Sequence, residues 1–353
     1  MLKIKLVLGC FLFFSISEAC FPCSAFKLES TDGPVVGKSY DWFLGYGAVI
    51  VNKRNVAKSA LLRDLISRPL QWTSKYASVT FNQYGWELPN GGMNEKGLTI
   101  EVLWLSETVL PSLDRRPTIN ESQIVQYGLD SFATTNELLK AIPDLRVTSI
   151  IARLHYYVCD IEGVCAVIEY LDGKLRISEK TDIITNDPVE NSRQYLSNFE
   201  GFGGNKPIPK DSNSLSRFVR ASHYAKKYNG QPLDKSIGLA FDILNQVLLK
   251  FPLDTYWQIV YDLKHQKVHF RALPTDDLIT YDLNTADFSC RTPTLGYDLN
   301  NHASGNLADH FIFFTKEINE TILKEGFGML RFAIPEEIKK LIFEYPATTE
   351  CRE

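Results

Sequence analysis

The 353-residue sequence lacks several features that mark special classes of protein. It has no run of five or more Lys and Arg residues, and its formal charge is −4, so no nucleic-acid partner is expected. It has no apolar stretch of about 20 residues, the length that a membrane-spanning helix needs. Internal repeats and low-complexity tracts are also missing. The hydrophobic fraction of 44% and the charged fraction of 23% indicate a globular protein with a large core.

A convincing set of metal ligands is missing as well. Asp160 and Glu162 lie close together in the sequence, but Ca²⁺ takes about six to eight oxygen ligands and no such cluster is present. We therefore expect neither a metal nor an organic cofactor.

The first residues have the pattern of a secretory signal peptide. Two lysines precede a short apolar run, residues 6–16, and the small-residue segment Ser17-Glu-Ala19 follows. This pattern predicts a signal peptide over residues 1–19, cleavage between Ala19 and Cys20, and one exported domain over residues 20–353, either periplasmic or secreted. A lipoprotein anchor on Cys20 is the alternative. Ser17 argues against it, because lipoprotein processing favours a Leu-like residue three positions before the cysteine.

Six cysteines remain after the predicted cleavage, and export permits disulfides. Cys159 and Cys165 flank a turn between two strand-like runs, which favours a cross-strand disulfide. Pairing of Cys290 with Cys351 has less support. Cys20 also forms a C-x-x-C pattern with the cysteine three residues later, but the strand that normally precedes a redox motif of this kind is missing.

Strand patterns and helix patterns come in separate runs along the chain. Their order predicts an α+β fold with mostly antiparallel sheets, because alternating βαβ units are not seen. The predicted helices are 119–132, 135–142, 215–228, 236–249 and 335–343. The predicted strands are 21–28, 35–42, 48–52, 77–84, 98–105, 149–159, 164–171, 182–185, 255–262, 267–272, 279–282 and 311–314.

A mature N-terminal cysteine carries a nucleophile and a base on one residue. The α-amine has a pKa of about 7.7–8.0, so much of it is neutral near neutral pH and can take the thiol proton. Cleavage before Cys20 would free this amine and would thereby activate the thiol. Cys20 is therefore the candidate nucleophile.

Several motifs in order connect the chain to a known family. They are Ala19-Cys20, Gly37-Lys-Ser-Tyr-Asp-Trp42, Gly92-Met-Asn-Glu-Lys-Gly-Leu98, Thr185-Asn-Asp-Pro188 and Leu215-Ser-Arg-Phe218. With these motifs the chain resembles the choloylglycine hydrolase and penicillin V acylase family of N-terminal nucleophile hydrolases. The resemblance implies a four-layer α/β/β/α sandwich and hydrolysis of a linear, non-peptide amide of a small molecule, with no cofactor.

The resemblance also implies roles for individual residues. Cys20 matches the nucleophile, and Asp41 matches the acid that orients its amine. Asn186 matches a side-chain donor to the oxyanion, and Arg217 matches an active-site arginine that supports the nucleophile by its charge. Trp104 is placed in the substrate pocket, where the neighbouring backbone would complete the oxyanion hole.

Two positions depart from the common pattern of the family. Lys38 stands where many members have Arg; it keeps the positive charge but loses the planar fork. It would still favour the thiolate. Trp104 stands where bile-salt hydrolases tend to have Asn and some penicillin V acylases have Tyr, which is similar to the Gram-negative branch of the family.

This branch favours penicillin V or N-acyl homoserine lactones as substrates, with bile salts as the first alternative. The acyl group would enter a pocket with aromatic walls, for which Phe21, Trp42, Tyr84 and Trp104 are candidates. A ceramidase-like lipid amide hydrolase is a second alternative, and an exported lipoprotein or binding protein with a decayed site is a third. An oligomer is compatible with the sequence, although the interval between Asn186 and Arg217 is shorter than in members that tetramerise through an inserted hairpin.

Overall fold

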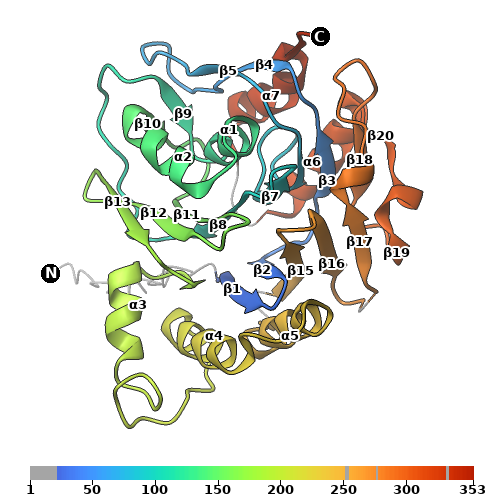
Figure 1. Cartoon of the computed structure of the whole chain (residues 1–353). Helices are drawn as coiled ribbons and strands as arrows, with labels where there is room; N and C mark the ends of the chain where they lie inside the picture. Colours follow the sequence, from blue (N-terminus) through green and yellow to red (C-terminus); the bar gives the residue numbers. More distant parts are fainter. Residues whose placement is uncertain (1–21, 251–253, 276, 331–333) are drawn as a thin grey trace, which may run out of the picture.

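Two large β-sheets lie face to face, and helices cover the outer face of each (Figure 1). The structure is a computed structural model, and it describes residues 22–250, 254–275, 277–330 and 334–353. The layers therefore follow the order helix, sheet, sheet, helix, as the family resemblance implied. Within the two sheets, nearly all neighbouring strands of the described residues run antiparallel, the pair β17 (Ile279–Asp282) and β19 (Gly305–Asn306) being parallel. The predicted α+β class is confirmed.

The first sheet carries the hairpin that opens the described chain. Its strand order is β14-β1-β2-β15-β16-β17-β19. Helices α4 (Ser214–Tyr228) and α5 (Leu233–Gln246) pack on its outer face, where apolar side chains of both helices meet those of β1. The strands are β1 (Ser24–Ser30), β2 (Gly33–Trp42), β14 (Ile183–Ile184), β15 (Asp254–Asp262), β16 (Lys267–Ala272), β17 (Ile279–Asp282) and β19 (Gly305–Asn306).

The second sheet has the order β13-β12-β11-β8-β7-β6-β3-β18-β20. Helices α1 (Gln123–Ser131) and α2 (Thr135–Ala141) cover part of its outer face (Figure 1). Its strands are β3 (Ala48–Asn52), β6 (Ser78–Asn82), β7 (Gly91–Asn94), β8 (Thr99–Trp104), β11 (Leu154–Cys159), β12 (Cys165–Leu171), β13 (Lys174–Glu179), β18 (Leu295–Asp298) and β20 (Ile312–Phe313). Shorter strands form two small sheets: β9 (Thr118–Asn120) with β10 (Arg146–Thr148), and β4 (Val56–Ser59) with β5 (Gln71–Thr73) and β21 (Glu350–Cys351).

The helices of the described chain are α1 (Gln123–Ser131), α2 (Thr135–Ala141), α3 (Val189–Leu196), α4 (Ser214–Tyr228), α5 (Leu233–Gln246), α6 (Lys316–Met329) and α7 (Glu336–Glu344). Short 3₁₀ turns lie at Ile142–Asp144, Leu283–Thr285, Leu307–His310 and Tyr345–Thr348. No helix of the described residues combines the length and the apolar character needed to cross a membrane.

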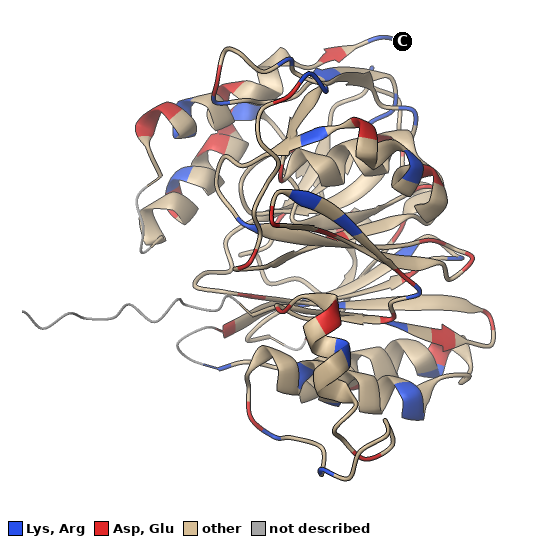
Figure 2. Cartoon of the chain, turned by 90° about the vertical axis from the view of Figure 1, so that its left-hand side faces the viewer, with Lys and Arg blue, Asp and Glu red and all other residues tan. Residues whose placement is uncertain are grey.

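One large core fills the space between the two sheets. Along β2, Val36 and Tyr40 point into this space, whereas Val35 joins the core under α4 and α5. Both faces of β2 are therefore buried, and the burial includes its polar residues Lys38, Ser39 and Asp41. In the view of Figure 2, charged residues of both signs are interspersed over the outer helices, the loops and some of the strands. Charged groups buried between the layers are exceptions that need an explanation.

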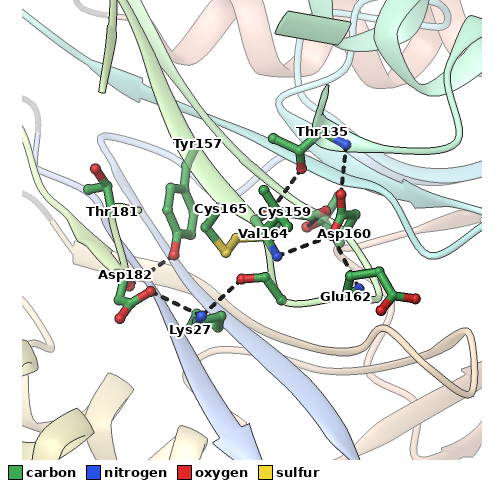
Figure 3. Close-up of a disulfide and its surroundings, with 12 residues drawn as sticks. Lys27, Thr135, Tyr157, Cys159, Asp160, Glu162, Val164, Cys165, Thr181 and Asp182 are labelled. Atoms are coloured by element: carbon green, nitrogen blue, oxygen red, sulfur yellow. Dashed lines mark hydrogen bonds and ion pairs between the residues drawn. A yellow bond between two sulfur atoms is a disulfide. The ribbon is translucent and has the colours of Figure 1, made fainter. Parts of the chain in front are cut away.

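Both predicted disulfides are present. Cys159–Cys165 closes the β11–β12 hairpin (Figure 3), and Cys290–Cys351 joins two distant segments of the chain. The turn of the β11–β12 hairpin also contacts β1, because Nζ of Lys27 donates to the carbonyl of Gly163 at 2.9 Å. The disulfide hairpin is thus attached to the strand that follows Cys23.

The predicted helix 119–132 begins later than expected. Residues Thr118–Asn120 form β9, which pairs in parallel with β10, and α1 begins at Gln123. Oδ1 of Asn120 accepts from the backbone nitrogen of Gln123 at 2.9 Å, at the start of this helix. At the start of α2, the Thr134 side chain caps the helix by accepting from the nitrogen of Glu137.

Candidate active site

The β1–β2 hairpin brings a cysteine next to the predicted acid. Ser24 pairs with Ser39, and Cys23 comes directly before β1. Cys23 is buried and is the free cysteine of the described residues. The carbonyl of Asp41 lies 4.0 Å from its Sγ. Cys20, the nucleophile expected from the sequence, lies outside the described residues; among the described residues, the cysteine next to Asp41 is Cys23.

Asn186 and Arg217 hold the backbone at Cys23. The nitrogen of Cys23 donates to Oδ1 of Asn186 at 2.6 Å, and Nη2 of Arg217 donates to the same oxygen at 2.8 Å. Nη1 of Arg217 donates to the Cys23 carbonyl and to Oγ of Ser24, both at 2.6 Å. Arg217 comes from α4 and is fully buried, so it is not a surface arginine. Its planar fork fits this set of acceptors.

Asp41 lies on β2 and is held from two sides. Its Oδ2 accepts from the hydroxyl of Ser39 at 3.0 Å, and its Oδ1 accepts from the hydroxyl of Thr255 on β15. The register of β2 with β15 places Thr255 directly opposite Asp41. Burial raises the pKa of Asp41 to about 6, although the charge of Arg217 and these two hydroxyls lower it in part. The carboxylate is thus fixed close to Cys23.

Lys38 reaches from one sheet to the other. Its Nζ donates to the carbonyl of Val102 on β8 at 2.8 Å, and the side chain is buried. Burial raises the pKa of the Cys23 thiol, and the positive charge of Lys38 counters that rise. Lys38 therefore acts on the thiol by charge and also ties β2 to β8.

The side-chain amide of Asn186 points toward Trp104. Its Nδ2 donates to the Trp104 carbonyl at 2.9 Å, and the backbone nitrogen of Asn186 donates to Oγ of Ser214 at 2.8 Å. The contact at Trp104 is thus made by a backbone acceptor, whereas a backbone donor was expected near this residue. An amide nitrogen carries two hydrogens, so Nδ2 retains a second hydrogen for an oxyanion.

A mostly apolar pocket opens beside Cys23. Trp42, Tyr84 and Trp104 contribute to its walls, as the sequence predicted, and the rings of Trp42 and Trp104 lie 6.2 Å apart. Phe21, the fourth predicted wall residue, lies outside the described residues. Residues that the sequence analysis did not single out complete the lining: Tyr40, Pro89, Asn90, Val102, Ser122, Ile151, Ala152 and Leu154.

The structure therefore gathers Lys38, Asp41, Trp104, Asn186 and Arg217 around one thiol, that of Cys23, whereas the motifs predicted an arrangement around Cys20. Cys23 and the hydroxyls of Ser24, Ser39 and Thr255 that lie around it were not singled out from the sequence. The predicted hairpin contained a signal for Cys23. When its two strands are paired residue by residue outward from the turn at 30–34, residues 22–23, rather than residue 20, lie opposite Asp41. Ser39 and Thr255 carried no such signal, because their roles depend on the pairing of distant strands.

Comparisons with known proteins agree with this geometry. The model of the family "Linear amide C-N hydrolases, choloylglycine hydrolase family" matches residues 23–296. A penicillin V acylase of Pectobacterium atrosepticum is 29% identical over 344 residues, which cover 84% of this chain and 91% of that protein.

Solved structures show the same fold. The penicillin V acylase of Agrobacterium tumefaciens has a TM-score of 0.75 and 25% identity, covering 83% of this chain and 98% of that one. A variant of the conjugated bile acid hydrolase of Clostridium perfringens has a TM-score of 0.67 and 18% identity, covering 80% and 98%. With a family match that begins at the buried cysteine and spans most of the chain, the protein belongs to the choloylglycine hydrolase family of linear amide C–N hydrolases.

Proposed function

We propose that Cys23, in place of Cys20, is the nucleophile of this hydrolase and that its α-amine is the base. The observation that carries the proposal is the position of Cys23, which lines the apolar pocket while its nitrogen contacts Asn186. The start of the family match at residue 23 supports it. In the described chain this nitrogen is a peptide amide joined to Pro22, so the proposal requires removal of residues 1–22.

Maturation then has two parts. Signal-peptide cleavage after Ala19, as predicted from the sequence, leaves Cys20-Phe-Pro22 in front of Cys23, and these residues are removed in a further step. We propose export to the periplasm or the medium on the basis of the N-terminal pattern. The two disulfides support this, because disulfides persist mainly in oxidising compartments.

The proposed reaction uses the groups around the freed N-terminus. The amine takes the thiol proton, and the Cys23 thiolate attacks the substrate carbonyl carbon. The second hydrogen of Asn186 Nδ2 stabilises the oxyanion, and the protonated amine gives its proton to the leaving nitrogen as the C–N bond breaks. Water then attacks the thioester with the amine again as base, which releases the acid and restores the thiol.

The acyl group that best suits the pocket is a flat aromatic one. Tyr40, Trp42, Tyr84 and Trp104 give the pocket aromatic walls, and aromatic rings pack favourably against one another. The relatives named as penicillin V acylases are more similar to this chain than the named bile acid hydrolase structure. We therefore propose a phenoxyacetyl amide such as penicillin V as substrate, ahead of N-acyl homoserine lactones and of bile salts.

A substrate panel tests this proposal. Purified mature enzyme is assayed with penicillin V, an N-acyl homoserine lactone, glycocholate and a ceramide, with Cys23→Ala as the inactive variant and Cys20→Ala as the matched control. We expect the highest kcat/KM on penicillin V, loss of all hydrolysis in Cys23→Ala, and activity in Cys20→Ala. Activity that depends on Cys20 would contradict the proposal that Cys23 is the nucleophile. Preference for glycocholate would contradict the proposal of a phenoxyacetyl amide as substrate. Binding without turnover would favour a decayed site.

A further inference from the structure

A buried carboxylate that none of the proposed chemical steps uses lies behind the pocket. Glu121 occupies the link between β9 and α1 and is almost completely buried. Burial raises the pKa of its carboxyl group, which means that ionising it in the interior costs free energy. A buried acid of this kind is stable only when hydrogen bonds compensate it, so its partners indicate its role.

Three consecutive backbone nitrogens converge on this carboxylate. The nitrogen of Ile150 donates to Oε2 at 2.8 Å, and those of Ile151 and Ala152 donate to Oε1 at 2.6 and 2.8 Å. The Ser149 hydroxyl adds a longer contact to Oε1 at 3.3 Å. Successive N–H groups that point at one anion form a concave nest, and such a nest fixes the local backbone. The conformation of residues 149–152 therefore depends on Glu121.

The residues held in this way form part of the pocket. Ile151 and Ala152 line it, and so does Ser122, the residue that follows Glu121. The position of Glu121 is itself fixed, because the hydroxyl of Tyr156 on β11 donates to its backbone carbonyl at 2.9 Å. One carboxylate thus connects two parts of the wall that would face the acyl group.

The nest is separate from the groups that perform the proposed chemistry. Asn186, two residues after β14, and Arg217 on α4 contact Cys23 from the side of the first sheet, whereas Glu121 supports the wall on the side of the second sheet. Displacement of the wall would change the fit of the acyl group and leave the contacts at Cys23 in place.

We propose that Glu121 is a positioning residue that sets the acyl selectivity of the enzyme, by holding residues 150–152 as one wall of the acyl pocket. This inference rests on the proposed function of the pocket. Replacing the carboxylate with an amide puts an NH₂ group against N–H donors, so Glu121→Gln leaves at least one of them without an acceptor. The wall then moves, and acyl groups that fit the native pocket lose their advantage.

The test compares amides that share one leaving amine and differ in the acyl group, phenoxyacetyl against hexanoyl. We expect Glu121→Gln to change the ratio of the two kcat/KM values by about 10-fold or more, the scale of a small misfit in an apolar pocket. Glu169→Gln is the matched control. Glu169 is also buried and accepts from a backbone nitrogen, that of Val189 at 3.1 Å, but it lies outside this pocket. Its substitution should leave the ratio unchanged.

An unchanged ratio in a folded Glu121→Gln enzyme would overturn the inference. If that variant does not fold, Glu121→Asp carries the test, since it keeps the charge and withdraws the carboxylate by one methylene; a native ratio there would also overturn it. Calorimetric binding of phenoxyacetate and hexanoate to the Cys23→Ala protein, with and without Glu121→Gln, gives a readout without catalysis. A wild-type enzyme that hydrolyses neither amide would instead contradict the proposed function.

Discussion

The backbone nitrogen of Cys23 and Oδ1 of Asn186 lie 2.6 Å apart, which joins two segments separated by 163 residues. Because Oδ1 accepts from Cys23 and also from Arg217, the amide of Asn186 has one orientation in which both contacts are satisfied. That orientation turns Nδ2 toward Trp104 and the pocket. The group that holds the backbone of Cys23 thus also aims the proposed oxyanion donor.

Asn186→Ala is expected to lower kcat by about 10²–10³-fold, the usual cost of removing one oxyanion donor. Asn186→Asp is the matched variant, because it keeps an oxygen for Cys23 and Arg217 but loses the N–H donor. Both variants should be impaired in single-turnover acylation. Near-native acylation by Asn186→Asp would show that Nδ2 does not stabilise the oxyanion.

Arg217→Lys is expected to lower kcat even though the positive charge remains. A single ammonium group cannot reproduce the planar fork that contacts Cys23, Ser24 and Asn186 together. Steady-state kinetics combined with thermal unfolding would separate catalysis from folding. Native kcat in Arg217→Lys would mean that charge alone is sufficient.

Asp41 makes the unfolding free energy of the unprocessed chain depend on pH. Its pKa is about 6 in the folded chain, above the ordinary 3.8, so the folded state binds the proton more tightly than the unfolded state. The tighter binding of this proton stabilises the folded state. This stabilisation is fully present below about pH 4 and is lost as pH rises through about 6. The loss amounts to about 3 kcal/mol for a shift of this size.

Asp41→Asn removes that titration. Urea unfolding of unprocessed Cys23→Ala protein, with and without Asp41→Asn, should therefore show that the stability advantage of Asp41 over Asn shrinks between pH 4 and pH 7. Parallel pH profiles for the two proteins would contradict the raised pKa of Asp41.

Lys38→Met is expected to raise the pKa of the Cys23 thiol, because the charge of Lys38 favours the thiolate. The pH dependence of iodoacetamide alkylation should shift to higher pH, and alkylation at pH 7 should be slower. Lys264→Met, which alters an exposed lysine paired with Asp32, is the control and should leave the profile unchanged. An unshifted profile in Lys38→Met would mean that Lys38 does not affect the thiol by its charge and acts only through its hydrogen bond to the Val102 carbonyl.

Local sequence patterns predict a large part of this fold. Strands 48–52, 267–272 and 279–282 have the predicted bounds, because each is a short run of strand-forming residues between turns. Helix α3 was missed for a tertiary reason. It begins at Val189, whose nitrogen is satisfied by Glu169 from a distant strand, and few of its side chains are buried. Its sequence therefore carries neither a local cap nor a strong apolar stripe.

In the candidate site, too, some residues can be predicted from local motifs and others depend on contacts between distant segments. Asp41, Asn186 and Arg217 lie in motifs that can be read directly, and the structure brings them together. The choice between Cys20 and Cys23 depends on the hairpin register, in which Ser24 pairs with Ser39. The signal-peptide pattern contains no information on that register and favours Cys20, whereas the proposal of Cys23 rests on the register. The wall supported by Glu121 was equally inaccessible, since it joins two segments that only the folded chain brings together.

The most direct test of the central claim is the N-terminal sequence and intact mass of the exported, catalytically active protein. The account predicts a chain that begins at Cys23 with a free α-amine. An active protein that begins at Cys20, or one that retains Pro22 in front of Cys23, would contradict it.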